Sequence, residues 1–369
     1  MPLLFRAPQG ELALVFPIRP MAPPITGVLL MNVGTPDSPR TADVRRYLKQ
    51  FLGDGRVIDL SWPGRKLLVN GIIAPFRAPK SAKAYARLWT AEGSPLILHG
   101  SGLRDALATA LGPDYRVALA MSYQRPSIQE GLAELRKAGA QRIVLVPLYP
   151  QYASSSTGAS LQAAFREIGQ WNDIPSISTV PPFYREEGYL AAFTDRIMAC
   201  GPQRFDHVLF SFHGLPERHM HRSHTPCSAY LDRNVNERPV TGCPCEVADH
   251  DEHPSCYKMQ CHWAARALAQ RCGLVQGKWS VGFQSRLNSA WIRPFSDVRV
   301  QDLAKAGHKK LLVVSPAFVA DCLETVIEIG EEYAELFKEH GGEELKLVPS
   351  LNASQAWVDA LTGLVRKAG

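Results

Sequence analysis

Long apolar runs are missing from this 369-residue sequence, and their absence excludes a membrane-spanning helix. No stretch reaches the 18 or more consecutive apolar residues that a helix needs to cross a bilayer. An export signal is missing too, because the first residues carry Glu11 and several prolines and lack an uninterrupted apolar core. We therefore expect residues 1–24 to form a flexible arm and the protein to work in the cytoplasm, which argues against a periplasmic binding protein.

Nucleotide-binding and nucleic-acid-binding motifs are also absent. No Gly-x-Gly-x-x-Gly and no P-loop follows an expected strand, and there is no RNP, zinc-finger or helix-turn-helix signature. The formal net charge of +6 is mild for this length, and the basic residues are dispersed. We expect no nucleic-acid partner. The small basic excess suits an anionic small molecule or contact with an anionic membrane surface.

An internal repeat organises what is present. The stretches "TGVLLMNVGTP" (26–36) and "DHVLFSFHGLP" (206–216) each read as a buried strand followed by Gly-x-Pro. Likewise, "KAGAQRIVLVPLYPQY" (137–152) matches "KAGHKKLLVVSPAFVA" (305–320). The apolar runs are short and continuous, as in strands buried on both faces of a parallel sheet, and helical patterns separate them. We predict an α/β fold in two duplicated domains, 25–185 and 186–369, with a cleft between them.

Polar side chains follow the expected strands. In an open α/β sheet the ligand lies beyond the carboxyl ends of the strands, so these positions are the ones to inspect. They hold Asn32, Tyr123 and Tyr149 in the first half, and His213 and Glu324 in the second. The strand that ends at His213 corresponds in the repeat to one that ends at Asn32, so the titratable side chain at this position belongs to the second half.

Five blocks together resemble the ferrochelatases, the enzymes that insert ferrous iron into a porphyrin. They are "GVLLMNVGTPDSP", "PKSAKAYARLWTAEGSPL", "VPLYPQYASSSTGAS", "LFSFHGLPERH" and "PAFVADCLETVIEIGEEY". The resemblance implies two Rossmann-like domains, each a four-stranded parallel sheet flanked by helices, around a porphyrin cleft. It implies insertion of Fe²⁺ into protoporphyrin IX as the last step of haem synthesis. The alternatives are a chelatase for coproporphyrin III or another tetrapyrrole and metal, and a non-catalytic haem- or metal-binding sensor.

By position, His213 and Glu324 match the catalytic pair of that family. Porphyrin loses two pyrrole protons, and an imidazole is the side chain suited to accept them near neutral pH. Either side chain can also ligate iron transiently, so proton removal and metal delivery by His213 both stay open. Glu324, Glu328 and Glu332 are spaced to share one face of a helix, where Glu328 extends a path for iron or protons. An exposed, solvated Glu332 is the equally weighted alternative.

The resemblance also implies the residues that contact the porphyrin. A large apolar ring with carboxylate arms needs aromatic walls and a few polar donors. The matched positions are Tyr123, Tyr149 and Trp291 for the walls, and Arg77 and Ser94 for the propionates.

A cysteine-rich insert at about 220–260 separates "LPERH" from the next helix. It has no apolar core of its own, and a metal centre is the usual device that holds so small a unit. Thiolate ligands from Cys227, Cys243, Cys245 and Cys256, with Cys261 as a competing ligand, suit a [2Fe–2S] cluster or structural zinc equally well by spacing. Nearby histidines add to the zinc alternative, and the resemblance favours the cluster. The oligomeric state is not predicted.

Overall fold

The computed structural model describes residues 3–6, 12–15, 24–223 and 256–369. Within the predicted arm, β1 (Leu3–Arg6) and β2 (Leu12–Val15) pair as an antiparallel hairpin. The remaining described strands form two separate four-stranded sheets in which every pairing is parallel.

The first sheet has the strand order β4-β3-β5-β6. Its strands are β3 (Thr26–Gly34), β4 (Tyr115–Tyr123), β5 (Arg142–Pro147) and β6 (Ser176–Thr179). Successive side chains of β3 enter different cores: Val28 and Leu30 lie in one apolar cluster, and Leu29 and Met31 in another. Because both faces of β3 are covered, its sequence is continuously apolar rather than alternating.

The second sheet has the order β10-β9-β7-β8, which repeats the first. Its strands are β7 (His207–His213), β8 (Trp279–Gln284), β9 (Lys310–Val314) and β10 (Glu344–Leu347). The repeat extends to backbone detail after the second strand of each half. Gln124 and Ser285 both take a positive φ, of 67° and 61°, that non-glycine residues rarely adopt. The predicted fold class is therefore confirmed.

Helices cover both sheets and add a separate layer. The described helices are α1 (Thr41–Leu52), α2 (Trp62–Leu67), η1 (Leu68–Ile73), α3 (Ala74–Leu88), α4 (Pro95–Leu111), α5 (Ile128–Lys137), η2 (Ser154–Gly158), α6 (Ala159–Ile168), α7 (Glu187–Ala199), η3 (Pro202–Arg204), α8 (Glu217–Ser223), α9 (Tyr257–Arg271), α10 (Ser296–Lys305), η7 (Leu323–Tyr333), α11 (Ala334–Glu339) and α12 (Gln355–Ala368). Helix α5 shows how local sequence sets a boundary: the Ser127 hydroxyl accepts from the Glu130 N–H, the Glu130 carboxylate accepts from the Ser127 N–H, and Gly139 follows the helix with a φ of +78°.

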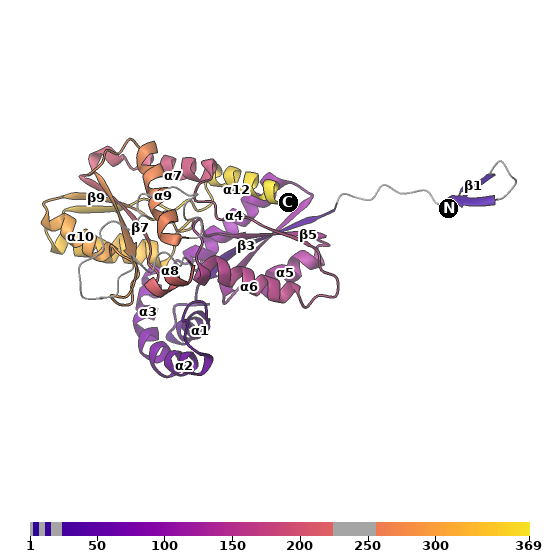
Figure 1. The fold of residues 1–369 in the computed structure, drawn as a ribbon, viewed down its shortest axis with the longest axis horizontal. Coiled ribbons are helices and arrows are strands. Elements are labelled where there is room, and N and C mark those ends of the chain that lie inside the picture. Colours follow the sequence, from indigo (N-terminus) through magenta and orange to yellow (C-terminus); the bar gives the residue numbers. More distant parts are fainter. Residues whose placement is uncertain (1–2, 7–11, 16–23, 224–255) are drawn as a thin grey trace.

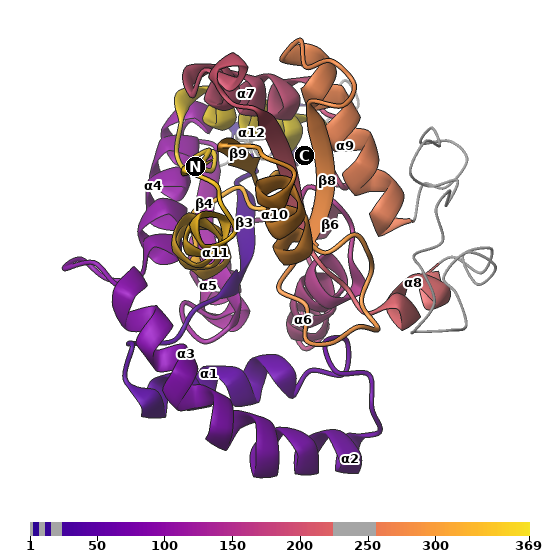
Figure 2. The same ribbon diagram turned by 90° about the vertical axis from the view of Figure 1, so that its left-hand side faces the viewer.

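Helices α1 to α3 form a layer below the two sheets (Figures 1 and 2). The buried face of α1 carries Val44, Tyr47 and Leu48, and it packs against Ala78 and Tyr85 of α3. The same cluster contains Ile327 of η7, so this layer touches the segment that carries Glu324.

The last helix crosses from the second half of the chain to the first. Helix α12 lies along α7 and α4 (Figure 1). Its residue Arg366 donates to the carbonyl of Ala110, which follows from this packing. The division into domains at about residue 185 stays a prediction, since one apolar cluster runs from β3 through α12 to β7.

Candidate active site

A cavity of about 310 Å³ lies beyond the carboxyl ends of the central strands and takes residues from both halves. This is where an open α/β sheet places a ligand. Its walls are mainly apolar and aromatic, with a few polar side chains among them. They include Asn32, Tyr47, Phe51, Ile58, Arg77, Tyr85, Tyr149, Gln151, His213, Pro216, His219, Ser285, Trp291, Phe318, Cys322 and Glu324.

His213 ends β7 and faces the cavity. Its Nδ1 lies 2.6 Å from the carbonyl oxygen of Gly214, which can only accept, so Nδ1 carries the hydrogen. The backbone carbonyl of His213 accepts from the Tyr257 hydroxyl at 2.8 Å. The turn also needs glycine at 214, because a Cβ there would lie 2.9 Å from the Gln284 carbonyl oxygen. In its neutral form the imidazole therefore carries its lone pair on Nε2.

Aromatic rings flank the imidazole. The ring centroids of Trp291 and Phe318 lie 6.2 and 6.3 Å from that of His213. Trp291 is buried and lines the cavity. Together these rings give this part of the cavity a flat apolar surface.

Glu324 reaches the cavity from the opposite element, η7. Its backbone carbonyl accepts from Nε2 of Gln284 at 2.9 Å, which ties η7 to the end of β8. Burial raises the pKa of Tyr47 and of Tyr85 well above the usual value, and the charge of Glu324 adds to the shift at each. These hydroxyls therefore stay protonated beside the carboxylate.

Glu328 lies one turn further and is held by four donors. Its Oε1 accepts from the Ser285 N–H at 2.8 Å and from the Tyr333 hydroxyl at 3.0 Å. Its Oε2 accepts from the Ser285 hydroxyl at 2.6 Å and from Gln284 at 3.3 Å. Burial raises the pKa of Glu328, while Ser285 and the charge of His213 oppose that shift. Glu328 therefore anchors the loop after β8.

Glu324, Glu328 and Glu332, here called the acidic stripe, lie on a different kind of helix from the expected α-helix. Residues 323–333 form a π-helix, whose i→i+5 bonds change the spacing of side chains around the axis. Only Glu324 of the acidic stripe lines the cavity, and Glu328 is enclosed. At the surface, Glu331 and Glu332 form ion pairs with Arg87 of α3, so Arg87 offsets part of the negative charge there.

Three of the predicted substrate-binding residues line the cavity, and two do not. Tyr149, Trp291 and Arg77 lie in its wall. The Tyr123 hydroxyl instead donates to Asp54 at 2.9 Å, outside the cavity lining. Ser94 is buried at the start of α4 and donates to Thr35 at 3.2 Å. Both alternatives satisfy a buried hydroxyl within the protein, so substrate contact by Tyr123 and Ser94 stays a prediction.

The two described candidates for the fourth cysteine ligand, Cys256 and Cys261, have different surroundings. Cys256 begins α9, and its sulfur accepts from the Met259 N–H at 3.5 Å. Cys261 is fully buried in the apolar core, and burial raises the pKa of its thiol well above the usual value. Cys227, Cys243 and Cys245 lie outside the described residues. Within the described part of the chain, no three His, Cys, Asp or Glu side chains gather as a metal site.

Sequence reasoning missed several residues of the cavity wall. Tyr47 and Phe51 of α1, Tyr85 of α3 and His219 of α8 all line it. An available signal was the apolar stripe of α1, which marks a buried face, although the stripe alone does not reveal that a cavity lies behind it.

Comparisons with known proteins agree with this geometry. The family model described as Ferrochelatase matches residues 25–369. The ferrochelatase of Stutzerimonas stutzeri strain A1501 is 45% identical over 344 residues, covering 92% of this chain and 97% of that protein. The ferrochelatase of Pseudomonas fluorescens strain Pf0-1 is also 45% identical, with the same coverage.

Among solved structures, SirB from Bacillus subtilis with Fe³⁺ shares the fold. Its TM-score is 0.50 at 14% sequence identity, and the match covers 93% of this chain and 95% of that one. No helix in the described part of the chain is long and apolar enough to cross a membrane. From the matched family, the extent of the match and the identity to curated relatives, the chain belongs to the ferrochelatase family.

Proposed function

We propose that this protein inserts ferrous iron into protoporphyrin IX, with His213 as proton acceptor and Glu324 as its partner on the opposite wall. Membership of the ferrochelatase family supports the reaction. The observation that carries the residue assignment is the placement of His213 and Glu324, from β7 and η7, in the wall of one aromatic cavity.

The arrangement of His213 suits it to accept a pyrrole proton. Since Nδ1 donates to the Gly214 carbonyl, Nε2 is the nitrogen that presents a lone pair when the imidazole is neutral. Deprotonation of two pyrrole nitrogens accompanies entry of one Fe²⁺, so the reaction releases two protons and changes no oxidation state. Glu324 supplies a second acceptor, and its negative charge favours the approach of the cation. The Tyr149 and Trp291 rings flank the macrocycle.

The polar lining supports protoporphyrin over coproporphyrin III. Among the described residues of the cavity wall, Arg77 alone is an arginine or lysine. Protoporphyrin carries two propionates and two apolar vinyl groups, whereas coproporphyrin carries four propionates. Because burying an unpaired carboxylate is costly, a mainly apolar wall with one guanidinium fits the substrate with fewer charges.

A [2Fe–2S] cluster held by Cys227, Cys243, Cys245 and Cys256 remains our inference for the cysteine-rich segment, with zinc as the alternative. Among the described residues, the position of Cys256 supports its role as a ligand. It lies at the N-terminus of a 15-residue helix, where the positive end of the helix dipole favours a thiolate. Cys261 fits the ligand role less well, because its apolar surroundings favour the neutral thiol. The cluster would brace this segment, and iron insertion needs no electron from it.

We also infer contact with an anionic membrane surface through α2, η1 and α3. Trp62, Leu67 and Phe76 are 64%, 75% and 77% exposed. Residues 60–91 contain no Asp or Glu, and they carry Arg65, Lys66, Arg77, Lys80, Lys83 and Arg87. Exposed apolar side chains among basic ones are typical of a peripheral membrane site. The cytoplasmic location stays a prediction, supported by described cysteines that form no disulfide.

Anaerobic assays of the purified protein test the function. Loss of protoporphyrin fluorescence on adding Fe²⁺, with appearance of haem absorbance, is the expected result. We expect kcat/KM for protoporphyrin to exceed that for coproporphyrin III by tenfold or more. Binding of porphyrin without turnover would indicate the sensor instead, and a preference for coproporphyrin III would overturn the substrate assignment.

A further inference from the structure

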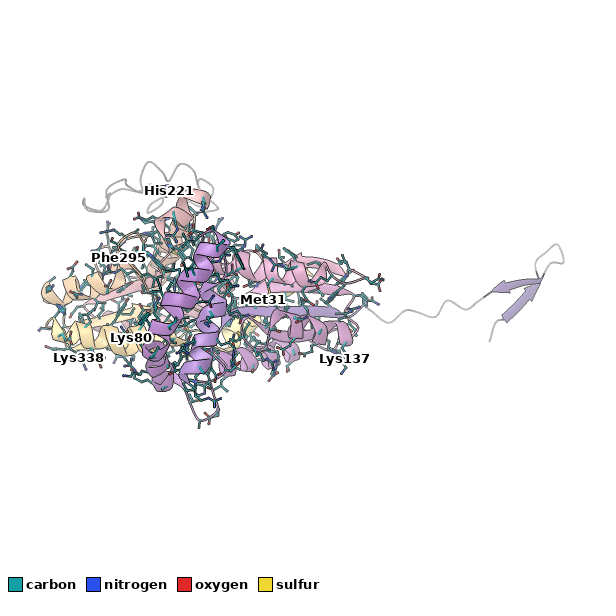
Figure 3. All side chains as sticks on the ribbon, turned by 90° about the horizontal axis from the view of Figure 1, so that it is seen from below. Met31, Lys80, Lys137, His221, Phe295 and Lys338 are labelled. Carbon is teal, nitrogen blue, oxygen red and sulfur yellow. The ribbon has the colours of Figure 1, made fainter. Side chains whose placement is uncertain are left out.

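A buried carboxylate joins the α1–α3 layer to helix α8 at the edge of the cavity. Asp59, in the connection between α1 and α2, has a side chain only 6% exposed. Its Oδ1 lies 2.5 Å from Nε of Arg218, and its Oδ2 lies 2.9 Å from Nη1 of Arg222. Both arginines are on α8, which carries the labelled His221 at one end of the α1–α3 layer in Figure 3.

The immediate neighbours of these charges are cavity wall. Ile58 lines the cavity directly before Asp59, and His219 lines it directly after Arg218. Arg218 donates its hydrogen bond to Asp59, which lies 159 residues earlier in the sequence, so the bond links α8 to the α1–α2 connection. Only the turn 214–216 separates α8 from His213, so the position of α8 affects the part of the cavity wall that holds His213.

Basic side chains outnumber the single carboxylate at the contact of Asp59 with α8. Burial favours the neutral acid, but the hydrogen bond from Arg218 and the charges of Arg218, His219 and Arg222 outweigh it and hold the pKa of Asp59 below its usual value. Nε2 of His219 lies 3.9 Å from Oδ1 of Asp59. One carboxylate therefore offsets two guanidinium groups, and without it these neighbouring groups on α8 would repel each other and lose their tie to the α1–α2 connection.

We propose that Asp59, with Arg218 and Arg222, is a positioning group that closes this edge of the porphyrin cavity and sets how tightly the macrocycle is held. The inference rests on the proposed function for the identity of the ligand. It assigns no chemical step to these residues. Their removal weakens retention of porphyrin and speeds release of haem, while the insertion step on bound substrate is retained.

Porphyrin affinity and single-turnover insertion separate positioning from chemistry. The variants are Asp59→Asn, Asp59→Arg, and a charge swap that combines Asp59→Arg with Arg218→Asp and Arg222→Asp. The matched control is Glu187→Gln, which removes an exposed ion pair with Arg271 between α7 and α9, away from the cavity. Protoporphyrin Kd is measured from quenching of tryptophan fluorescence, and haem release by transfer to a haem-free globin.

We expect Asp59→Asn to raise the porphyrin Kd and the haem release rate about fivefold to tenfold, in line with two partly exposed ion pairs. Asp59→Arg should have a larger effect, and the charge swap should recover most of the loss. The saturated single-turnover rate should stay within twofold of wild type. An unchanged Kd in folded Asp59→Asn and Asp59→Arg variants overturns the proposal, as does a change in Glu187→Gln of equal size. If the wild type binds porphyrin without inserting iron, the proposed function fails while the Kd comparison still decides this inference.

Discussion

Replacing Glu328 tests whether this carboxylate anchors the loop after β8. Alanine would leave the Ser285 N–H, the Ser285 hydroxyl and the Tyr333 hydroxyl without their acceptor. Each unsatisfied buried group costs about 1–3 kcal/mol, and water can reach the half-buried Ser285, so we expect the low end of the sum: Glu328→Ala should lower the free energy of unfolding by about 3–5 kcal/mol. Glu328→Gln keeps one acceptor oxygen and removes the buried charge, so we expect a smaller loss of about 1–2 kcal/mol.

Urea unfolding at pH 7, followed by circular dichroism, measures this difference. The matched comparison is Glu324→Ala, one turn earlier on η7, whose carboxylate faces the cavity. That variant should stay within about 1 kcal/mol of wild type in stability while its turnover falls about 100-fold or more. A Glu328→Ala variant as stable as wild type would refute the anchoring role, because the Ser285 and Tyr333 donors would then have found other partners.

Further predictions concern stability, membrane contact, cysteine ligands and propionate binding. Burial lowers the pKa of His207 to about 4 from 6.5, so its contribution to stability is complete above pH 6.5 and is lost as the pH falls through 4. His207→Gln should therefore lose up to about 3 kcal/mol less stability than wild type over this pH range, as measured by urea unfolding. Parallel pH profiles of the two proteins would contradict this. Leu67→Ser with Phe76→Ser should reduce sedimentation with anionic vesicles at least fivefold, and equal binding would exclude this surface. In anaerobically purified protein, Cys256→Ser should lose iron–sulfur absorbance that Cys261→Ser retains; a colourless wild type that contains zinc would exclude the cluster. Arg77→Gln should raise the protoporphyrin KM about tenfold with kcat little changed, whereas an unchanged KM would remove Arg77 from propionate binding.

The duplicated fold was predictable because the information for it is local and repeated. Buried parallel strands need continuous apolar residues, and each half shows the same succession of such runs, so the shared strand order follows. The boundaries of α5 were equally readable, because Ser127 and Gly139 supply a start and a stop that act within a few residues. His213 could be singled out because it ends a strand, whereas Glu324 lies well beyond the end of β9 and was proposed from the resemblance of its block to the ferrochelatases.

Other features depend on contacts between distant segments. The π-helix of η7 could not be read from "LETVIEIGEEY", because its apolar and acidic residues suit an α-helix as well. Tyr123 ends β4, as a cavity residue could, yet its hydroxyl reaches Asp54 on the α1–α2 connection. The ion pairs of Asp59 likewise join two segments whose sequences give no sign of each other.

The central claim is that His213 accepts a pyrrole proton during iron insertion, and anaerobic turnover of His213→Ala tests it most directly. His340→Ala is the matched control, because His340 also has Nδ1 bonded to a backbone carbonyl, that of Leu336 at 2.9 Å, and lies outside the cavity lining. We predict that His213→Ala still binds protoporphyrin but forms haem at least 100-fold more slowly, whereas His340→Ala matches wild type. Haem formation by His213→Ala within threefold of the wild-type rate would contradict the account.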